Sequence, residues 1–239
     1  MNQHQIVSQM PSLKKYFVDG TLNFRKTFDT YLRSIGKDPS AMWTKIEDSI
    51  RSVYIEKHAM MERMGRMYGS TRHFFEMVRF DFVVDEDLDI YLMEANMSPN
   101  LSSLHFAPNK ILYEQVVFNV LSLVGLTHHL SIHNWQNRND EIWNMMVSDK
   151  DLSVYEELCM SDDCHLSCKD PKCRVCFYCL DAYTKLALKD AYIEHSAKHN
   201  QKRIIPSVNA TSQVAPGVHN ELQHIWFTGM CLKNVAWCS

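Results

Sequence analysis

The feature that most constrains the fold is a pair of short segments whose side chains alternate with a period of two. The first segment spans residues 78–84 and the second spans residues 90–96. A period of two is the side-chain repeat of a β-strand. The linker from Asp85 to Asp89 is acidic at four of its five positions, and such a short polar linker is typical of a turn. The sequence therefore predicts an antiparallel hairpin.

The hairpin predicts a close pair of carboxylates. If the strands pair symmetrically about the turn, Asp81 lies opposite Glu94, and Arg79 lies opposite Asn96 on the same face. Directly opposed β-carbons are about 4.5–5.5 Å apart, and like charges so close repel each other. A divalent cation between Asp81 and Glu94 would remove the repulsion, with Asn96 as a neutral oxygen ligand. Few protein ligands, all oxygen, suit Mg²⁺ whose other ligands are phosphates.

Two other interpretations of these acids stay open. In the first, the hairpin simply carries scattered, solvated acids; in the second, Arg79 is the counter-charge in place of a metal. The acids of the linker from Asp85 to Asp89 are interpreted as a solvated turn.

Helices are predicted on both sides of the hairpin. One runs from Leu22 to Ile35 and ends before Gly36, because glycine readily adopts the left-handed conformation after a helix. A second runs from Met42 to Met64, and a third spans residues 107–124. Apolar residues recur in the second helix at helical spacing and predict a stripe that faces a core. These residues are Trp43, Ile46, Ile50, Val53 and Tyr54. The methionines of residues 60–67 are expected to fill gaps in that core.

The hairpin also carries a family resemblance. Phe80-Asp81-Phe82, then Glu94-Ala95-Asn96 and Ser98-Pro99-Asn100-Leu101, resemble the C-terminal half of the tubulin tyrosine ligase-like domain, which has an ATP-grasp fold. The resemblance covers residues 40–128, and Asn100 departs from it because the family usually has serine there. The cysteine-rich insertion is similar to that of an atypical, polyglutamylase-like member.

The resemblance implies a site and a reaction. Asp81, Glu94 and Asn96 would bind the magnesium ions that bridge the phosphates of ATP, and Arg79 is a candidate phosphate contact. ATP would activate a carboxylate as an acyl-phosphate, which an amine then attacks to form an amide. The implied co-substrate is glutamate, and the implied partners are tubulin and microtubules. The implied location is cytoplasmic and cytoskeleton-associated, although a secretory or membrane setting stays open if the chain continues upstream.

The resemblance also implies that half of an active site is missing. In this family the phosphate-covering loop, the lysines that contact ATP and the adenine pocket precede the hairpin, and nothing in residues 1–40 resembles them. Lys14, Lys15 and Lys26 are interpreted as surface lysines. The chain alone is therefore expected to be inactive. The alternative function is a catalytically inactive, ligase-like interaction module with a stabilised cysteine cluster.

Six cysteines cluster after the ligase-like region. They fall within 21 residues, with His165 among them: Cys159, Cys164, Cys168, Cys173, Cys176 and Cys179. The preferred interpretation is structural zinc, because Cys173-x-x-Cys176-x-x-Cys179 has the spacing of zinc ligands and Cys164 or Cys168 could be the fourth. Disulfides are the second interpretation, because six is an even number and the spacings are short. Buried or free thiols are the third. Cys231 and Cys238 show no partner pattern.

Composition sets the remaining limits. The 239 residues carry 25 Lys and Arg against 28 Asp and Glu, a net charge of −3, which gives no general attraction to nucleic acid. No segment is long and apolar enough to predict a membrane span. N-glycosylation sequons begin at Asn96, Asn100 and Asn209. A glycan on Asn96 would block a magnesium ligand, so the sequons favour a cytosolic setting.

The predicted fold class is α+β: a partial ATP-grasp domain, in which a small antiparallel sheet is flanked by helices, followed by a helical cysteine-rich region. The expected divisions are a helical lead-in over residues 1–40, the C-terminal half of the ligase domain over 41–128, a cysteine-rich helical appendage over 129–206, and a weakly ordered tail over 207–239.

Overall fold

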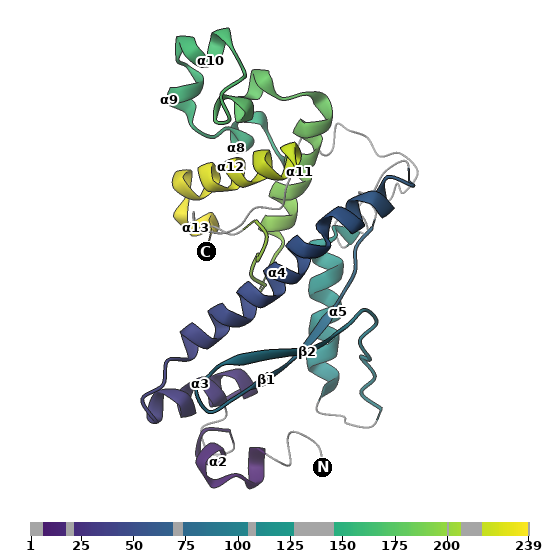
Figure 1. Cartoon of the computed structure of the whole chain (residues 1–239), viewed down its shortest axis with the longest axis vertical. Helices are drawn as coiled ribbons and strands as arrows, with labels where there is room; N and C mark the ends of the chain where they lie inside the picture. Colours follow the sequence, from purple (N-terminus) through teal and green to yellow (C-terminus); the bar gives the residue numbers. More distant parts are fainter. Residues whose placement is uncertain are drawn as a thin grey trace. The chain divides into compact units, whose positions relative to one another are not determined.

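A computed structural model describes residues 7–17, 22–68, 74–104, 109–126, 146–199, 201–206 and 217–238. The chain divides into two compact units. Unit 1 comprises residues 1–53 and 79–96, and unit 2 comprises residues 54–78 and 97–239. The described elements are mostly helical with one two-stranded sheet, so the predicted α+β class is confirmed (Figure 1).

Unit 1 begins with two helices. Helix α2 spans Pro11–Phe17, and helix α3 spans Phe24–Ser34. The side-chain oxygen of Asn23 accepts a hydrogen bond from the backbone N–H of Lys26 at 2.8 Å, which caps the start of α3. At the other end Gly36 has a φ of +77°, the left-handed conformation in which glycine carries no β-carbon penalty. The predicted helix and its stop at Gly36 are confirmed.

Helix α4, Pro39–Gly65, is the predicted amphipathic helix. Its N-terminal part packs on α3, because Met42 is buried and the indole N–H of Trp43 donates to Asp29 at 2.8 Å. The guanidinium of Arg25 lies 4.3 Å from the centre of the Trp43 ring, a cation–π contact. The expectation for the methionines was wrong. Each of these side chains is more than half exposed: Met60, Met61, Met64 and Met67.

The predicted hairpin is present as strands β1, Arg79–Val84, and β2, Ile90–Asn96. Asp81 pairs with Glu94, and Arg79 pairs with Asn96, in the antiparallel register that symmetry predicted. Nearer the turn the predicted register was wrong by one residue. Symmetry would pair Val84 with Tyr91, whereas Val84 pairs with Ile90. The two registers meet at an irregularity after Asp81 that leaves Met93 as the extra residue of a β-bulge.

The acidic turn is built by Asp85. Its carboxylate oxygen accepts hydrogen bonds from the backbone N–H groups of Asp87 and Asp89, at 3.0 and 2.8 Å. Lys45 of α4 forms an ion pair with Asp89 at 2.5 Å and donates to the carbonyl of Leu88. The predicted solvated turn is confirmed, because Glu86, Asp87 and Asp89 are exposed, and two of its acids also make structural contacts. Asp85 closes the turn, and Asp89 ties it to α4.

Unit 2 contains helix α5 and the C-terminal elements. Helix α5 spans Asn109–Leu123 and is followed by Gly125 at a φ of +78°, so the predicted helix and its stop are confirmed. The remaining described elements are short helices or turns and three C-terminal helices: α8 Asp149–Leu152, α9 Glu156–Cys159, α10 Asp162–Leu166, η1 Cys173–Val175, η2 Phe177–Cys179, α11 Ala182–Ser196, α12 Val218–Lys233 and α13 Val235–Cys238.

The core of unit 2 surrounds Trp226 of α12, which is fully buried. Its indole N–H donates to the carbonyl of Leu152 at 2.8 Å, so the buried polar atom is satisfied. Lys233 of the same helix donates to the carbonyls of Lys150 and Ser153. Helix α12, drawn in yellow in Figure 1, therefore fixes the segment around α8.

The expectation of a weakly ordered tail was wrong for its described part. Residues 218–238 form α12 and α13, and the side chains of Leu222, Trp226 and Met230 are buried. These three residues are spaced by four positions, which is a helical repeat. Polar residues between these positions make the repeat hard to recognise in the sequence.

The zinc interpretation was also wrong. Three disulfides join Cys159 to Cys176, Cys164 to Cys173, and Cys168 to Cys179. Because zinc binds thiolates, sulfurs that are bonded to each other cannot serve as its ligands. This removes the proposed ligands Cys164, Cys168, Cys173, Cys176 and Cys179. A fourth disulfide joins Cys231 to Cys238, a pair that the sequence pattern did not predict.

Among the described residues, no helix combines the length and the apolar character needed to cross a bilayer.

Gly229 of α12 offers a test of this packing. A β-carbon at Gly229 would lie 2.7 Å from Cβ of Val154 and 2.9 Å from the Tyr155 ring. Gly229→Ala should therefore lower the free energy of unfolding by about 1–3 kcal/mol through overpacking, although alanine is the better helix former. Thermal or urea unfolding of the whole chain measures the change. Leu232→Ala, at an exposed position of the same helix, is the control. Equal or greater stability of Gly229→Ala would contradict the packing.

Candidate functional site

The hairpin brings four polar side chains together on one face. Both carboxylate oxygens of Asp81 accept hydrogen bonds from the Arg79 guanidinium, at 2.8 and 3.0 Å. The amide Nδ2 of Asn96 donates to Glu94 at 2.8 Å and to Asp81 at 3.3 Å. Asn96 therefore bridges the two acids that face each other across the strands. The structure thus assembles all four residues that the sequence singled out.

The bulge at Met93 produces this arrangement. The turn sets the register in which Val84 pairs with Ile90, and that register, continued, would place Asp81 opposite Met93. Successive side chains of a strand point to opposite faces, so Glu94 would then lie on the other face. The extra residue shifts β2 by one position and returns Glu94 to the face of Asp81.

Electrostatics in this cluster favour an ionised Asp81. The pKa of Asp81 is lowered from its usual value, mainly by the hydrogen bonds from Arg79 and less by a hydrogen bond with the Glu94 carboxyl group. The two acids are therefore near enough to interact, and Arg79 supplies the counter-charge that their proximity requires. This was one of the open alternatives to a metal.

The residues present also fit a magnesium ion. Two carboxylates converge on an amide that presents an oxygen when it rotates by half a turn, so all three donors can be oxygen, the atom type that Mg²⁺ prefers. In the described part of the chain, no group of three or more His, Cys, Asp or Glu residues could hold a metal ion. A metal at the hairpin would thus need further oxygen ligands. The site is open to receive them, because 37% of the Asp81 side chain is exposed.

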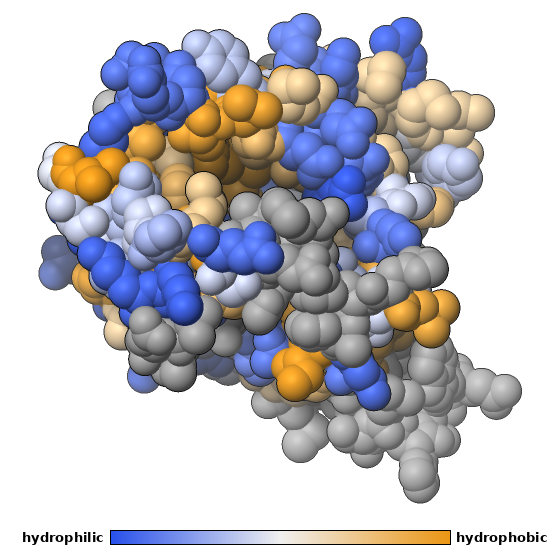
Figure 2. Space-filling model, turned by 90° about the horizontal axis from the view of Figure 1, so that it is seen from below, coloured by the Kyte–Doolittle hydropathy of each residue, from blue (hydrophilic) through white to orange (hydrophobic). Residues whose placement is uncertain are grey.

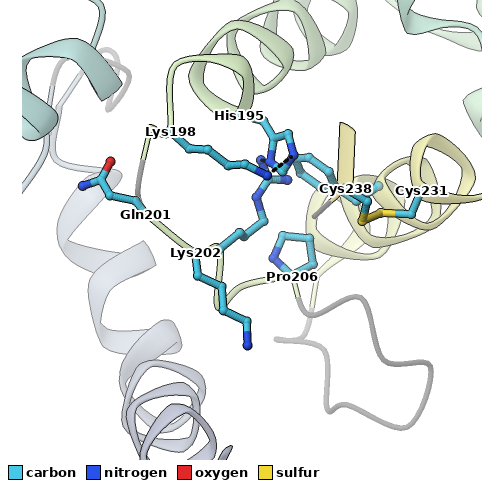
Figure 3. A pocket seen from close by; sticks show the side chains of 9 residues that line it. His195, Lys198, Gln201, Lys202, Pro206, Cys231 and Cys238 are labelled. Carbon is cyan, nitrogen blue, oxygen red and sulfur yellow. Dashed lines mark hydrogen bonds between the residues drawn. A yellow bond between two sulfur atoms is a disulfide. The ribbon is translucent and has the colours of Figure 1, made fainter. Parts of the chain in front are cut away.

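A second candidate site, in unit 2, was missed in the sequence. A cavity of about 430 Å³ lies between the end of α11, residues 201–206 and the helices α12 and α13. Figure 3 shows Lys198 reaching to His195, and the Cys231–Cys238 disulfide at one side of the cavity. Two of its lining atoms, Oε1 of Gln201 and Nη1 of Arg203, are buried without a hydrogen-bond partner. No spacing pattern links these residues, so only the fold could reveal them.

His195 is buried among cations. Its Nε2 lies 2.6 Å from the carbonyl oxygen of Trp237, and its Nδ1 lies 2.6 Å from Nη2 of Arg203. A carbonyl only accepts and a guanidinium only donates, so these two contacts require Nε2 to carry the proton and Nδ1 to accept. The ammonium of Lys198 also only donates, and although it lies 3.1 Å from Nε2, it then donates to the carbonyl oxygen of Trp237 at 3.4 Å. Burial is the main cause that lowers the pKa of His195 to about 4; the charges of Arg203 and Lys198 also lower it, and the hydrogen bond to the Trp237 carbonyl opposes the shift. Burial also lowers the pKa of Arg203 to about 9.

Comparison with known proteins places these features in a class of ligases. The model of the tubulin-tyrosine ligase family matches residues 9–153. The probable tubulin polyglutamylase ttll-15 of Caenorhabditis elegans is 34% identical over 233 residues, which are 96% of this chain and 45% of that protein. The chain therefore belongs to the tubulin-tyrosine ligase family, and the resemblance found at the hairpin is confirmed.

More distant relatives match shorter segments. The tubulin polyglutamylase TTLL13 of Mus musculus is 31% identical over 83 residues, which are 32% of this chain and 10% of that protein. The tubulin glycylase 3F of Tetrahymena thermophila is 22% identical over 174 residues, 62% of this chain and 19% of that protein. No solved structure gives a significant match. The chain spans about half the length of ttll-15.

The neutral state of His195 predicts a pH dependence. An unfolded histidine has a pKa of about 6.5, whereas His195 in the folded chain has a pKa of about 4. Between these values the unfolded state binds a proton that the folded state does not, so stability should fall as the pH is lowered from 6.5 to 4. His195→Gln can keep both hydrogen bonds and does not titrate. Its thermal midpoint should therefore fall less between pH 7 and pH 4.5 than that of the unmodified chain. Identical falls would contradict the assignment.

Proposed function

We propose that this chain carries the magnesium-binding half of an ATP-dependent carboxylate–amine ligase of the tubulin tyrosine ligase type. The observation that carries the proposal is the pairing of Asp81 with Glu94 beside Asn96, in a chain that belongs to this family. Both acids contact the Asn96 amide, and the bulge at Met93 brings Glu94 to the face of Asp81.

In this proposal Asp81 and Glu94 would hold magnesium, and Asn96 would supply its amide oxygen. When bound, the ion would neutralise phosphate charge during phosphoryl transfer. Arg79 then has a second role. It now pairs with both oxygens of Asp81, and a cation taking those oxygens would release the guanidinium toward a phosphate, which it can contact through two parallel N–H groups.

The reaction proposed for the whole enzyme joins an amino acid to a polypeptide carboxylate. A carboxylate oxygen takes the γ-phosphoryl group of ATP to give an acyl-phosphate and releases ADP. The amine of the incoming amino acid then attacks the acyl carbon, the phosphate leaves, and the nitrogen loses a proton to form the amide. Glutamate is the proposed amino acid and an acidic polypeptide tail the proposed acceptor. Tubulin is the acceptor that the names of the relatives indicate, and with tubulin as acceptor the chain would be cytoskeleton-associated.

Exposed apolar surface supports the view that the hairpin forms only part of a domain. Figure 2 shows hydrophobic side chains at the surface among hydrophilic ones. On the hairpin, Val83, Tyr91, Leu92 and Met93 are all more than a third exposed. A two-stranded hairpin is marginal in stability by itself, and exposed apolar surface of this kind marks an interface. The proposed occupant is the ATP-binding half of the ligase domain.

The second candidate function is an inactive ligase-like interaction module. The cavity beside His195, lined by Lys198, Lys202 and Arg203, is the observation that favours it. A module of this kind needs no metal at the hairpin, so metal binding to Asp81 and Glu94 separates the two functions.

Metal binding can be tested on the chain itself with Mn²⁺ as a paramagnetic substitute for Mg²⁺. Mn²⁺ should broaden the amide signals of residues 79–82 and 93–96, and excess Mg²⁺ should reverse the effect. Asp81→Asn should abolish the broadening, and the exposed turn variant Glu86→Gln should retain it. Arg79→Gln should strengthen binding severalfold, because it removes the cation that competes for Asp81. Broadening that is confined to residues 85–89 and survives Asp81→Asn would contradict the proposal.

Activity of the proposed ligase can be tested in a chimera. The chain alone is expected not to consume ATP in amide formation, whereas a chimera that joins it to the part of ttll-15 outside the region it matches should add glutamate to tubulin tails. In the chimera Asp81→Asn and Glu94→Gln should each lower the rate more than about 100-fold, since each removes a proposed metal ligand. Glu86→Gln should change it less than about threefold. A chimera that folds and is equally active in all four forms would exclude these residues from the site.

A further inference from the structure

Every cysteine of this chain is in a disulfide. The sequence contains eight cysteines, the structure pairs all eight in four bonds, and none is free. Each bond forms when two thiols give up two electrons and two protons to an oxidant. Cytosolic thiol systems keep thiols reduced, whereas secretory compartments supply dithiol–disulfide oxidants. A chain in which every cysteine is paired is therefore expected to fold in an oxidising compartment.

The three clustered disulfides form the core of their segment. Helices α9 and α10 contain four and five residues, and the turns η1 and η2 contain three each. The buried cluster in this segment consists of Cys164, Cys173 and Cys176, with Leu158 packed beside it. Segments this short cannot bury enough apolar surface to hold their shape. The bonds are therefore required for this part of the fold, and a reducing compartment would leave it unfolded.

The fourth disulfide lies at the C-terminal end of unit 2. Cys231 of α12 is bonded to Cys238 of α13, and Trp237 between them stacks on Tyr192 and accepts a hydrogen bond from His195 through its carbonyl. The bond thus holds Trp237 in place against His195. Two separate parts of unit 2 consequently depend on oxidised cysteines.

In an oxidising secretory compartment the sequons are candidate sites of N-glycosylation. Asn96 is a proposed metal ligand whose amide Nδ2 donates to Glu94 and Asp81, and Pro99 directly follows its sequon, which disfavours glycan transfer. Asn100 begins the sequon Asn-Leu-Ser in an exposed segment outside the helices and strands. Its Oδ1 accepts from the backbone N–H of Ser102 at 2.8 Å. Its Nδ2, the atom that would carry a glycan, has no hydrogen-bond partner among the described residues.

We propose that this chain folds in an oxidising secretory compartment and that Asn100 is N-glycosylated there. In that step Nδ2 of Asn100 forms a bond to C1 of the first sugar of a lipid-pyrophosphate-linked oligosaccharide. The C1–O bond to the pyrophosphate breaks, Nδ2 loses a proton, and the lipid pyrophosphate leaves. A glycan at Asn100 leaves Asp81, Glu94 and Asn96 unmodified. The inference does not rest on the ligase proposal. If both hold, the acidic acceptor in the cell is a polypeptide that the chain meets in that compartment, and tubulin tails are its substitute in the test tube.

The direct test is mass spectrometry of the protein from its own cells, alkylated at once on lysis. The proposal expects no cysteine to be alkylated before reduction, and peptides joining Cys159 to Cys176 and Cys231 to Cys238. Enzymatic glycan removal in heavy-oxygen water should convert Asn100, and not Asn96, to labelled Asp. Alkylated cysteines would overturn the compartment, and an unmodified Asn100 would overturn the glycan.

Matched variants expressed through a secretory pathway provide the second test. In an Asn209→Gln background, Asn100→Gln should abolish the mobility shift on glycan removal, and Asn96→Gln should leave it intact. The paired variant Cys164→Ser with Cys173→Ser should make residues 159–179 sensitive to protease, whereas Ser167→Ala, within the same segment, should not. A cysteine-pair variant as resistant as the unmodified chain would overturn the claim that this segment depends on its disulfides.

Discussion

The proposed site depends on holding two like charges face to face on a hairpin. Asp81 and Glu94 repel unless a cation or hydrogen-bond donor lies between or beside them, and the structure supplies Arg79 and Asn96 in those positions. The bulge at Met93 imposes the pairing against the register that the turn sets. In the proposed function, a metal ion that binds both acids takes the place of the contacts that Arg79 and Asn96 make here.

The sequence predicted the site because strand periodicity is local. Alternation places Asp81 with Arg79, and Glu94 with Asn96, whatever surrounds the hairpin. Symmetry about the turn also predicted the correct partners, but only because two errors cancel. The turn is one residue shorter than symmetry assumes, and the extra residue of the bulge shifts the pairing back by one. The turn geometry, in which Asp85 binds two backbone N–H groups, could not be derived from the acidic composition alone.

Other parts of the fold needed information that no local pattern contains. Which cysteines pair depends on which sulfurs the folded chain brings together, so spacing alone could not separate zinc from disulfides. The exposed methionines of α4 have the spacing of core residues, yet the described chain places no partner over them. The cavity beside His195 joins residues from α11, α12 and α13, and its existence follows from how those helices pack.

The two units of the chain are stabilised by different means. Unit 1 relies on a capped helix, the Trp43–Asp29 hydrogen bond and the Lys45–Asp89 ion pair. Unit 2 combines the core around Trp226 with four disulfides. The ligase-like hairpin and the disulfide-rich region thus make separate demands. In the proposals above, the first takes part in an ATP-dependent site, and the second folds in an oxidising environment.

The most direct measurement of the central claim is the anomalous diffraction of Mn²⁺ in crystals of this chain. The account predicts a manganese peak within about 2.0–2.3 Å of carboxylate oxygens of both Asp81 and Glu94, with the Arg79 guanidinium displaced from Asp81. An intact Arg79–Asp81 pair, with no manganese between the two acids at saturating concentration, would contradict it.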